Sequence, residues 1–271
     1  FGILNSFNNL QNRIKKELVR INNEDTKYLL ELLESNDYDK IKSELPKFKK
    51  YIKEDLLSFV TPKSVWTIGG DGWAYDIGFG GLDHVASSNE KVRILVLDTE
   101  VYSNTGGQSS KSSHLGQVCE FASGGKKTSK KDLFKIAMSY PNIYVGSISL
   151  GGNFMQAIKT IKEAEEHDGP SIIIAYCPCI EQGIKGGMSN SIKEEALAVD
   201  SGYVLLMRYK DNKLYLDSKE PNFDKYDEFL SNEVRYNALK IKDIKKANEL
   251  LAINKEIAVQ RYNYYKEISN K

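Results

Sequence analysis

The amino-acid sequence predicts an α/β protein: a parallel β-sheet covered by helices on both faces, with helical extensions at both ends. Two observations predict the sheet. Short strands alternate with helical segments in the middle of the chain, and each strand is apolar on both faces, as in a buried parallel sheet. A third observation predicts the extensions, because helical spacing replaces this alternation toward each end. We therefore expect three parts: residues 1–61, 62–210 and 211–271.

The first part is expected to be helical throughout and to carry no chemistry. Apolar side chains recur at steps of three and four residues, which is typical of one buried helix face: Ile3, Phe7, Leu10, Ile14, Leu18 and Ile21. Asn22 and Asn23 end this helix, and the leucines of residues 29–33 indicate a second one. Pro46 is expected to open a further helix that ends near Phe59.

The central part alternates strands and helices. Strands are expected at 64–68, 92–97, 143–149 and 171–176, and helices at 73–88, 130–139 and 153–167. Between the second strand and the second helix lies a polar, glycine-rich connection, residues 98–129. Connections longer than about 15 residues are usually functional or disordered, so we expect function to concentrate here.

The last part returns to helix after a hairpin. Residues 203–209 and 213–216 are expected to pair around Asp211 and Asn212. The tail carries one apolar stripe: Ile244, Ala247, Leu251, Ala258, Tyr262 and Tyr265.

Composition excludes two classes of function. Lys and Arg number 38 against 37 Asp and Glu, so no basic excess points to nucleic acid. No stretch approaches the roughly 18 apolar residues of a membrane span. The cysteines, Cys119, Cys177 and Cys179, are too few for a disulfide framework and indicate a reducing compartment. The chain begins Phe1-Gly2-Ile3, so we expect it to be a piece of a longer polypeptide.

The turn Gly70-Asp71-Gly72 follows the first strand. Ligands of open α/β sheets bind at this edge. The glycines permit close backbone approach and positive φ, and the helix beginning near Trp73 offers free amides to an anion. A carboxylate here would repel a diphosphate unless a divalent cation such as Mg²⁺ lay between them.

A second polar segment leaves the next strand, from Asp98 to Gly107. Because neighbouring parallel strands end at the same edge, Asp71 and Thr99 are expected to converge across 28 residues of sequence. A lone Gly-Asp-Gly is most often an ordinary acidic turn. Combined with a strand–helix–strand of this length and a Thr- and Asn-rich exit, it has the form of the thiamine-diphosphate signature.

Residues 69–78, residues 97–108 and Gly183 with its neighbours closely resemble the pyruvate:ferredoxin (flavodoxin) oxidoreductase family, in its C-terminal thiamine-diphosphate-binding domain. The likeness extends from about Ser64 to Tyr209. It implies that Asp71, Thr99 and the backbone carbonyl of Val101 hold Mg²⁺. The general thiamine-enzyme pattern has Asn where Thr99 stands, but a hydroxyl also ligates. Cofactor contacts are implied for the residues around these ligands: Gly70, Gly72, Trp73, Tyr102, Ser103 and Asn104.

The resemblance also implies a catalytic position and a cluster ligand. Asn104 matches the asparagine beside the reacting substrate, although it also suits an Asx-turn before Thr105. Cys179 matches the cysteine that ligates the 4Fe-4S cluster nearest the cofactor, whereas Cys177 is assigned no role. A cluster needs four thiolates, so the other ligands are expected upstream of this chain.

For the whole enzyme the resemblance implies a pyruvate:ferredoxin, or NADP-linked, oxidoreductase. Pyruvate is decarboxylated on thiamine diphosphate, electrons pass through iron–sulfur clusters to ferredoxin or another acceptor, and coenzyme A takes the acyl group. The chain is then a fragment, inactive without the remaining domains and homodimeric when full length. The cytoplasm, or a protist hydrogenosome or mitochondrion-related organelle, is expected. Two alternatives stay open: a thiamine-dependent decarboxylase or carboligase without clusters, and a non-catalytic module that kept the fold.

Other polar residues carry weaker expectations. His114 and His167 are expected to be exposed. Glu100 and Glu120 are acid–base candidates whose partners the sequence does not reveal.

Overall fold

The computed structural model describes residues 1–270 and separates into two compact units, Phe1–Val65 and the remainder from Trp66. The first unit contains α1 (Gly2–Ile21), α2 (Glu24–Ser35), α3 (Tyr38–Ser43), α4 (Leu45–Tyr51) and a 3₁₀ helix at Glu54–Phe59. α1 ends where Asn22 adopts a left-handed conformation, with φ of 50°. Asn23 then caps α2 through a reciprocal pair of hydrogen bonds with Thr26.

Two expectations for this unit are wrong in detail. Ile3 and Ile21 are 77% and 43% exposed, because only the middle of the α1 stripe meets the core formed with α2 and the later helices. The helix expected from Pro46 to Phe59 is divided in two. α4 ends at Tyr51, since Ile52 is extended and buries its side chain, and the 3₁₀ helix follows.

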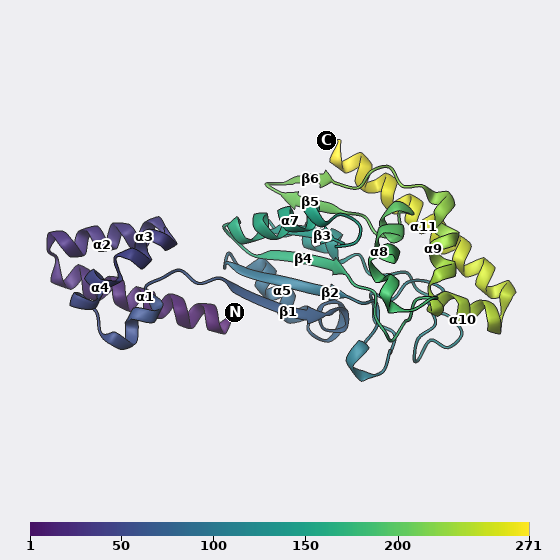
Figure 1. Cartoon of the computed structure of the whole chain (residues 1–271), viewed down its shortest axis with the longest axis horizontal. Helices are drawn as coiled ribbons and strands as arrows, with labels where there is room; N and C mark the ends of the chain where they lie inside the picture. The colour runs from purple at the N-terminus through teal and green to yellow at the C-terminus, as the bar shows by residue number, and fades with distance from the viewer. Residues whose placement is uncertain (271) are drawn as a thin grey trace. The chain divides into compact units, whose positions relative to one another are not determined.

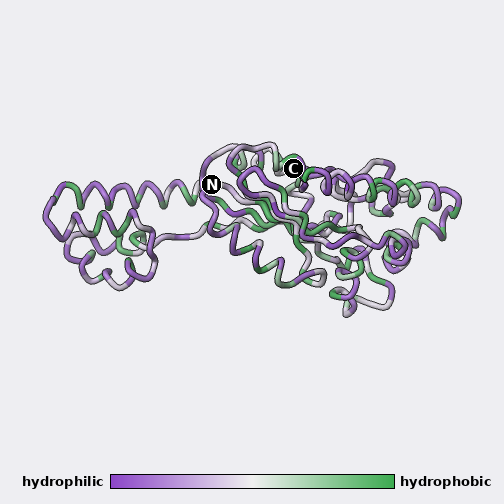
Figure 2. The backbone as a smooth tube through the Cα atoms, turned by 90° about the horizontal axis from the view of Figure 1, so that it is seen from above, coloured by the Kyte–Doolittle hydropathy of each residue, from purple (hydrophilic) through white to green (hydrophobic). Residues whose placement is uncertain are grey.

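Within the described residues, the second unit contains a six-stranded sheet with the strand order β1-β2-β4-β3-β5-β6. The strands are β1 (Val65–Gly70), β2 (Val92–Asp98), β3 (Tyr144–Ile148), β4 (Ser171–Tyr176), β5 (Met207–Lys210) and β6 (Lys213–Leu216). β2 and β3 both run parallel to β4. The hydrophobic stretches of the strands lie side by side in this unit (Figure 2).

The expected hairpin is present and makes the sheet mixed. β5 pairs antiparallel with β3, and β6 pairs antiparallel with β5. Asp211 and Asn212 both have positive φ, 52° and 59°, which matches the twist that a two-residue hairpin turn requires. The parallel arrangement therefore holds for the centre of the sheet, and the hairpin extends one edge.

Helices cover both faces of the sheet (Figure 1). The second unit has a π-helical segment (Gly72–Ile77), α5 (Phe79–Ser87), α6 (Leu133–Ala137), α7 (Phe154–Glu166), α8 (Ser191–Asp200), α9 (Tyr226–Asn232), α10 (Val234–Lys242) and α11 (Ile244–Ser269), with short 3₁₀ turns at 103–105, 188–190 and 223–225. Gly146 of β3 faces Thr160 of α7. The next residue, Ser147, faces the opposite side, toward α6 and α11. No described helix has the length and apolar character needed to cross a bilayer.

The helix expected from Trp73 to Ser88 is interrupted. Its first turn is π-helical, because the Gly78 amide donates to the Trp73 carbonyl five residues back, at 2.8 Å. α5 begins only at Phe79. The break keeps the residues after β1 in a wider coil, a conformation that is frequent at functional sites.

The long connection after β2 is ordered by internal bonds rather than by regular structure. The Gly107 amide donates to the Tyr102 carbonyl at 2.8 Å, and Gly116 and Lys126 are similarly linked at 2.8 Å. Several of its polar side chains are completely buried, including Ser112, Ser113 and Gln117. The connection is therefore a built part of the fold.

Candidate functional site

Asp71 and Thr99 meet at the carboxyl ends of β1 and β2, although 28 residues separate them in sequence. The Thr99 hydroxyl lies 2.8 Å from Asp71 Oδ1 and 3.1 Å from the Val101 carbonyl oxygen. The Ser103 hydroxyl lies 2.9 Å from the same Thr99 oxygen. Three kinds of oxygen that bind hard cations, a carboxylate, hydroxyls and a backbone carbonyl, thus lie close together at the sheet edge.

The spacing of these oxygens suits Mg²⁺. An octahedral Mg²⁺ with ligands at about 2.1 Å places neighbouring ligand oxygens about 3.0 Å apart. The distances from the Thr99 hydroxyl to Asp71 Oδ1, 2.8 Å, and to the Val101 carbonyl oxygen, 3.1 Å, lie just below and just above that value. The described residues hold no cluster of three or more His, Cys, Asp or Glu side chains suited to a metal. One carboxylate with neutral oxygens is the partial protein shell that Mg²⁺ takes when phosphates and water complete it.

Asp71 is a buried carboxylate that forms no ion pair with any residue that the structure describes. It has no exposed surface, and its oxygens accept from Thr99 and from the Ser110 hydroxyl, the latter at 2.5 Å. Burial raises the pKa of Asp71 to about 7, and the charge of Asp98 adds to this shift. Lys130 acts on it only at longer range, because Lys130 pairs with Asp98 and Glu100. A divalent cation would remove this imbalance.

The glycine turn is shaped by aromatic packing. A β-carbon on Gly72 would lie 2.4 Å from the Tyr102 ring, and one on Gly78 would lie 2.1 Å from the Trp73 ring. Gly70, by contrast, faces open space, with no atom within 4 Å of an added β-carbon. Neither Gly70 nor Gly72 is among the described residues with positive φ, so that part of the expectation is wrong. Close approach of an aromatic ring explains the glycine at positions 72 and 78.

The exit loop after Thr99 carries the other expected contacts. Val101 is buried, and the Tyr102 hydroxyl donates to the Gly72 carbonyl at 3.3 Å, which joins the two loops. Asn104 is exposed in the 3₁₀ turn Ser103–Thr105. No hydrogen bond of its side chain is found in the described part of the chain, so the Asx-turn alternative lacks its defining contact.

The two cysteines after β4 lie in different surroundings. Cys179 Sγ is 3.2 Å from the Ser103 hydroxyl, which places it two hydrogen bonds from Thr99. Cys177 packs with Trp66 against the core between α7 and the sheet. Burial raises the pKa of Cys177 to about 12, with the charge of Glu195 adding to the shift. Cys177 is therefore held as a neutral thiol, whereas Cys179 borders the candidate site.

Sequence reasoning missed the environment of Glu100. Its side chain is 1% exposed and contacts Lys130 at 2.9 Å and His114 at 3.0 Å. Burial alone would raise the pKa of Glu100, but Lys130 and Arg235 hold it well below its usual range. His114 is buried, not exposed as expected, and burial lowers its pKa to about 4. These partners are distant in sequence, so no local pattern could have revealed them.

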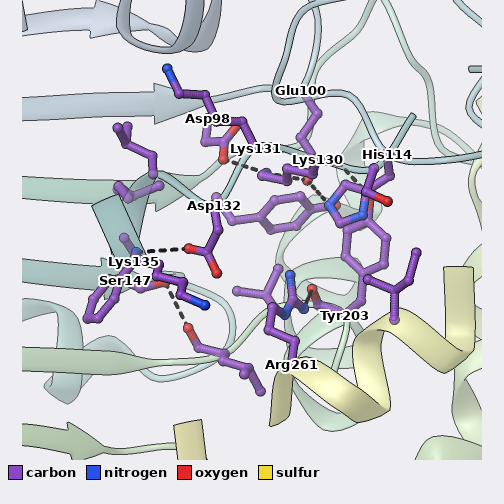
Figure 3. Close-up of a pocket in the computed structure, with 18 of the residues that line it drawn as sticks. Asp98, Glu100, His114, Lys130, Lys131, Asp132, Lys135, Ser147, Tyr203 and Arg261 are labelled. Atoms are coloured by element: carbon purple, nitrogen blue, oxygen red, sulfur yellow. Dashed lines mark hydrogen bonds and ion pairs between the residues drawn. The ribbon is translucent and has the colours of Figure 1, made fainter. Parts of the chain in front are cut away.

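A cavity of about 410 Å³ lies between the sheet and α11 (Figure 3). Asp98 and Glu100 line it, but Asp71, Thr99 and Val101 do not. Its charged groups are largely engaged within the fold: Lys130 bridges Asp98 and Glu100, and Asp132 accepts from the Tyr265 hydroxyl at 2.7 Å. The cavity is separate from the oxygen cluster at the sheet edge.

Comparison with known proteins gives a consistent picture. Residues 57–175 match the family described as thiamine pyrophosphate enzyme, C-terminal TPP binding domain. The chain is 47% identical to pyruvate:ferredoxin oxidoreductase of Moorella thermoacetica over 253 residues, covering 87% of this chain and 21% of that protein. It is 47% identical to pyruvate-flavodoxin oxidoreductase of Klebsiella pneumoniae over 214 residues, covering 76% and 18%.

Two further similarities differ in strength. The mitochondrial pyruvate dehydrogenase [NADP(+)] of Euglena gracilis is 46% identical over 225 residues, covering 80% of this chain and 12% of that protein. A solved structure, the 2-oxoglutarate:ferredoxin oxidoreductase of Magnetococcus marinus, matches with a TM-score of 0.41 and 23% identity, covering 65% of this chain and 66% of that one. The chain thus spans about a fifth or less of the length of the sequence relatives named here.

Proposed function

Because this chain belongs to the pyruvate:ferredoxin (flavodoxin) oxidoreductase family, we propose that it binds the diphosphate end of thiamine diphosphate through Mg²⁺. Asp71, Thr99 and the Val101 carbonyl would hold the metal. The observation that carries the proposal is the buried Asp71 carboxylate, which has hydroxyl partners but no ion pair within the described residues. A Mg²⁺ ion held by these residues would supply the positive charge that the buried carboxylate lacks, and without that charge the carboxylate would repel a diphosphate.

The surrounding residues have separate roles in this proposal. Gly70 leaves the open space in which the cofactor approaches the backbone, while Gly72 and Trp73 shape the turn beside it. Tyr102 and Ser103 tie the exit loop to the turn and to Thr99. The exposed amide of Asn104 is free to face the substrate. When bound, thiamine diphosphate supplies the electron sink for decarboxylation of a 2-oxoacid.

For the complete enzyme we propose oxidative decarboxylation of pyruvate. Pyruvate and coenzyme A yield acetyl-CoA and CO₂, and two electrons pass through iron–sulfur clusters to ferredoxin, flavodoxin or an NADP-linked acceptor. Cys179 would supply one 4Fe-4S ligand, because it adjoins Ser103 at the proposed cofactor site. The remaining ligands, and the domain that holds the other end of the cofactor, would come from the rest of a homodimeric enzyme.

The location proposed for the enzyme is a reducing compartment such as the cytoplasm. Cys119, Cys177 and Cys179 are all free thiols, as expected where disulfides do not persist.

The test is a titration of the full-length apoenzyme with thiamine diphosphate, with and without Mg²⁺. We expect Asp71→Ala to weaken Mg²⁺-dependent binding by roughly 100- to 1,000-fold, since it removes the only charged ligand. Residual binding should be nearly independent of Mg²⁺. Thr99→Val should give a weaker form of the same change, and Val101→Ile should bind like the parent because only its carbonyl is involved. Unchanged, Mg²⁺-dependent binding by Asp71→Ala would place the metal elsewhere.

Two rival functions give other results. A decarboxylase or carboligase without clusters would bind thiamine diphosphate but contain neither iron nor acid-labile sulfide. A module that kept only the fold would bind neither Mg²⁺ nor the cofactor.

A further inference from the structure

Glu100 stands between two proposed metal ligands, Thr99 and Val101, but its side chain belongs to a different environment. The Thr99 hydroxyl points to Asp71, whereas the buried Glu100 carboxylate contacts groups that follow it in the chain, two of them, Tyr203 and Arg235, from the C-terminal half. Glu100 also has φ of 61°, in the left-handed region that residues with a β-carbon seldom adopt. Such a conformation persists only where the surroundings hold it in place.

Both oxygens of the Glu100 carboxylate have two partners each. One carboxylate oxygen lies 2.9 Å from Lys130 Nζ and 3.0 Å from His114 Nε2. The other lies 2.7 Å from the Tyr203 hydroxyl and 2.5 Å from Arg235 Nη1. Figure 3 shows Lys130, His114 and Tyr203 directed toward this side chain.

The main chain of Glu100 is fixed as well. Its carbonyl oxygen accepts from the Ser113 hydroxyl at 2.6 Å and from Gln117 Nε2 at 3.0 Å. Gln182 donates to the carbonyl of the preceding residue, Thr99. Peptide units are planar, so fixing the torsions of Glu100 also fixes how Thr99 and Val101 are oriented to one another. The 3.1 Å separation between the Thr99 hydroxyl and the Val101 carbonyl depends on that orientation.

We propose that Glu100 is a positioning residue for the metal site, and that Tyr203 and Arg235 act through it to hold the Thr99–Val101 loop in its metal-binding geometry. The proposal rests on the function proposed above. It gives the C-terminal extension a role: Arg235 lies at the start of α10, and its bond to Glu100 spans 135 residues of sequence. Groups that orient metal ligands without touching the metal typically change metal affinity by about 10- to 100-fold when removed.

The cations around Glu100 do not depend on it alone. Lys130 also pairs with Asp98 at 2.6 Å. Arg235 Nε lies 2.9 Å from Glu233, an ion pair although not in hydrogen-bond geometry. Removing the Glu100 charge therefore leaves Lys130 beside Asp98 and Arg235 beside Glu233, so neither buried cation loses all its ion pairs. The conformation of the Thr99–Val101 loop has no such second support from the carboxylate.

The experiment measures Mg²⁺ affinity of the full-length apoenzyme at saturating thiamine diphosphate by calorimetry. Glu100→Gln should weaken Mg²⁺ binding about 10- to 100-fold. Glu100→Gly satisfies the left-handed backbone but removes the carboxylate, and it should weaken Mg²⁺ binding similarly. Parent-like affinity in Glu100→Gly would overturn the proposal, because backbone conformation alone would then suffice.

A matched tyrosine pair keeps the test valid if the Glu100 variants fail to fold. Tyr203→Phe removes one hydroxyl from Glu100, and Tyr144→Phe removes a similar bond to Glu163, 2.9 Å long, between β3 and α7. Tyr203→Phe should weaken Mg²⁺ binding about three- to tenfold, while Tyr144→Phe stays within about twofold of the parent. Equal effects of the two changes would mean that Tyr203 acts only on general stability.

A second readout needs no bound cofactor. Hydrogen exchange of residues 98–104 in the metal-free enzyme should accelerate in Tyr203→Phe but not in Tyr144→Phe.

Failure of the metal assignment and failure of the positioning role give different results. If Asp71→Ala retains Mg²⁺ affinity, the metal assignment is wrong. If Asp71→Ala loses affinity and the Glu100 and Tyr203 variants retain it, only the positioning role is wrong.

Discussion

Two buried carboxylates follow neighbouring strands of the sheet and differ in what neutralises them. Asp71 comes after β1 and accepts hydrogen bonds from hydroxyl groups. Glu100 comes after β2 and contacts Lys130 and Arg235. Burial raises the pKa of Asp71 to about 7, whereas the cations hold the pKa of Glu100 well below its usual value. The fold therefore neutralises Glu100 with its own cations, whereas Asp71 has no ion pair among the described residues, which agrees with the proposal that it binds a cation from outside.

Buried carboxylates with different partners are suited to different roles, one structural and one in ligand binding. Sequence alone made both glutamate and aspartate candidates for chemistry. In the structure the Glu100 carboxylate has cationic partners, whereas the Asp71 carboxylate has only hydroxyl partners among the described residues, and on this difference we base the loop-positioning role proposed for Glu100 and the ligand role proposed for Asp71.

The largest expected effect on stability is at Glu100. Glu100→Gln should lower the free energy of unfolding of the metal-free protein by about 3 kcal/mol, the lower end of the range for breaking a buried ion pair, since Lys130 and Arg235 keep other partners. Urea unfolding followed by circular dichroism measures this. A loss below about 1 kcal/mol would mean that Glu100 is not a structural anchor, and the contrast with Asp71 would collapse.

A smaller effect is expected from pH through His114. Its folded pKa of about 4 lies below the unfolded value of 6.5, so the unfolded chain binds more protons between these pH values. This group therefore contributes stability that is complete above pH 6.5 and is lost as pH falls toward 4, by at most about 3 kcal/mol. His114→Gln should flatten the pH dependence of urea unfolding in that window. An unchanged slope would place the buried titrating group elsewhere.

Substitution of the two cysteines is expected to have the smallest effect on stability, and it tests whether Cys179, near the Asp71 site, ligates a cluster. Cys179→Ser should remove or shift the spectrum of one cluster in the full-length enzyme, because Cys179 adjoins Ser103. Cys177→Ser should keep all clusters and cost about 1 kcal/mol from burying a hydroxyl in the apolar cluster with Trp66. Equal loss of a cluster in both variants would contradict the assignment.

Local pattern was sufficient for the parallel strands of the sheet and for part of the site, but not for the antiparallel addition of the hairpin to β3. The apolar run of β4 predicted its bounds, and the shared edge of parallel strands predicted that Asp71 and Thr99 converge. The same reasoning did not foresee the π-helical break before Gly78, which depends on how Trp73 packs between two glycines.

Tertiary partners were beyond the reach of sequence patterns. His114 sits in a polar stretch, typical of exposed loops, yet it is buried against Glu100 and stacks on Tyr203. Arg235, within an ordinary charged helix, completes the same cluster from 135 residues away. Such a cluster follows from the assembled fold, because His114 and Arg235 both lie in polar segments that look solvent-exposed in sequence.

The central claim is that the buried Asp71 carboxylate is neutralised by a bound Mg²⁺ ion, and Asp71→Asn tests it most directly. The change removes the charge and keeps the volume. At pH 8 without metal, Asp71→Asn should be more stable than the parent by about 1 kcal/mol, because an uncompensated buried charge is gone. The parent should gain about 2.7 kcal/mol from Mg²⁺ and thiamine diphosphate at 100 times the dissociation constant, and Asp71→Asn should gain almost nothing. The account is contradicted if Asp71→Asn is less stable without metal and still gains the parent's full stabilisation from the ligands.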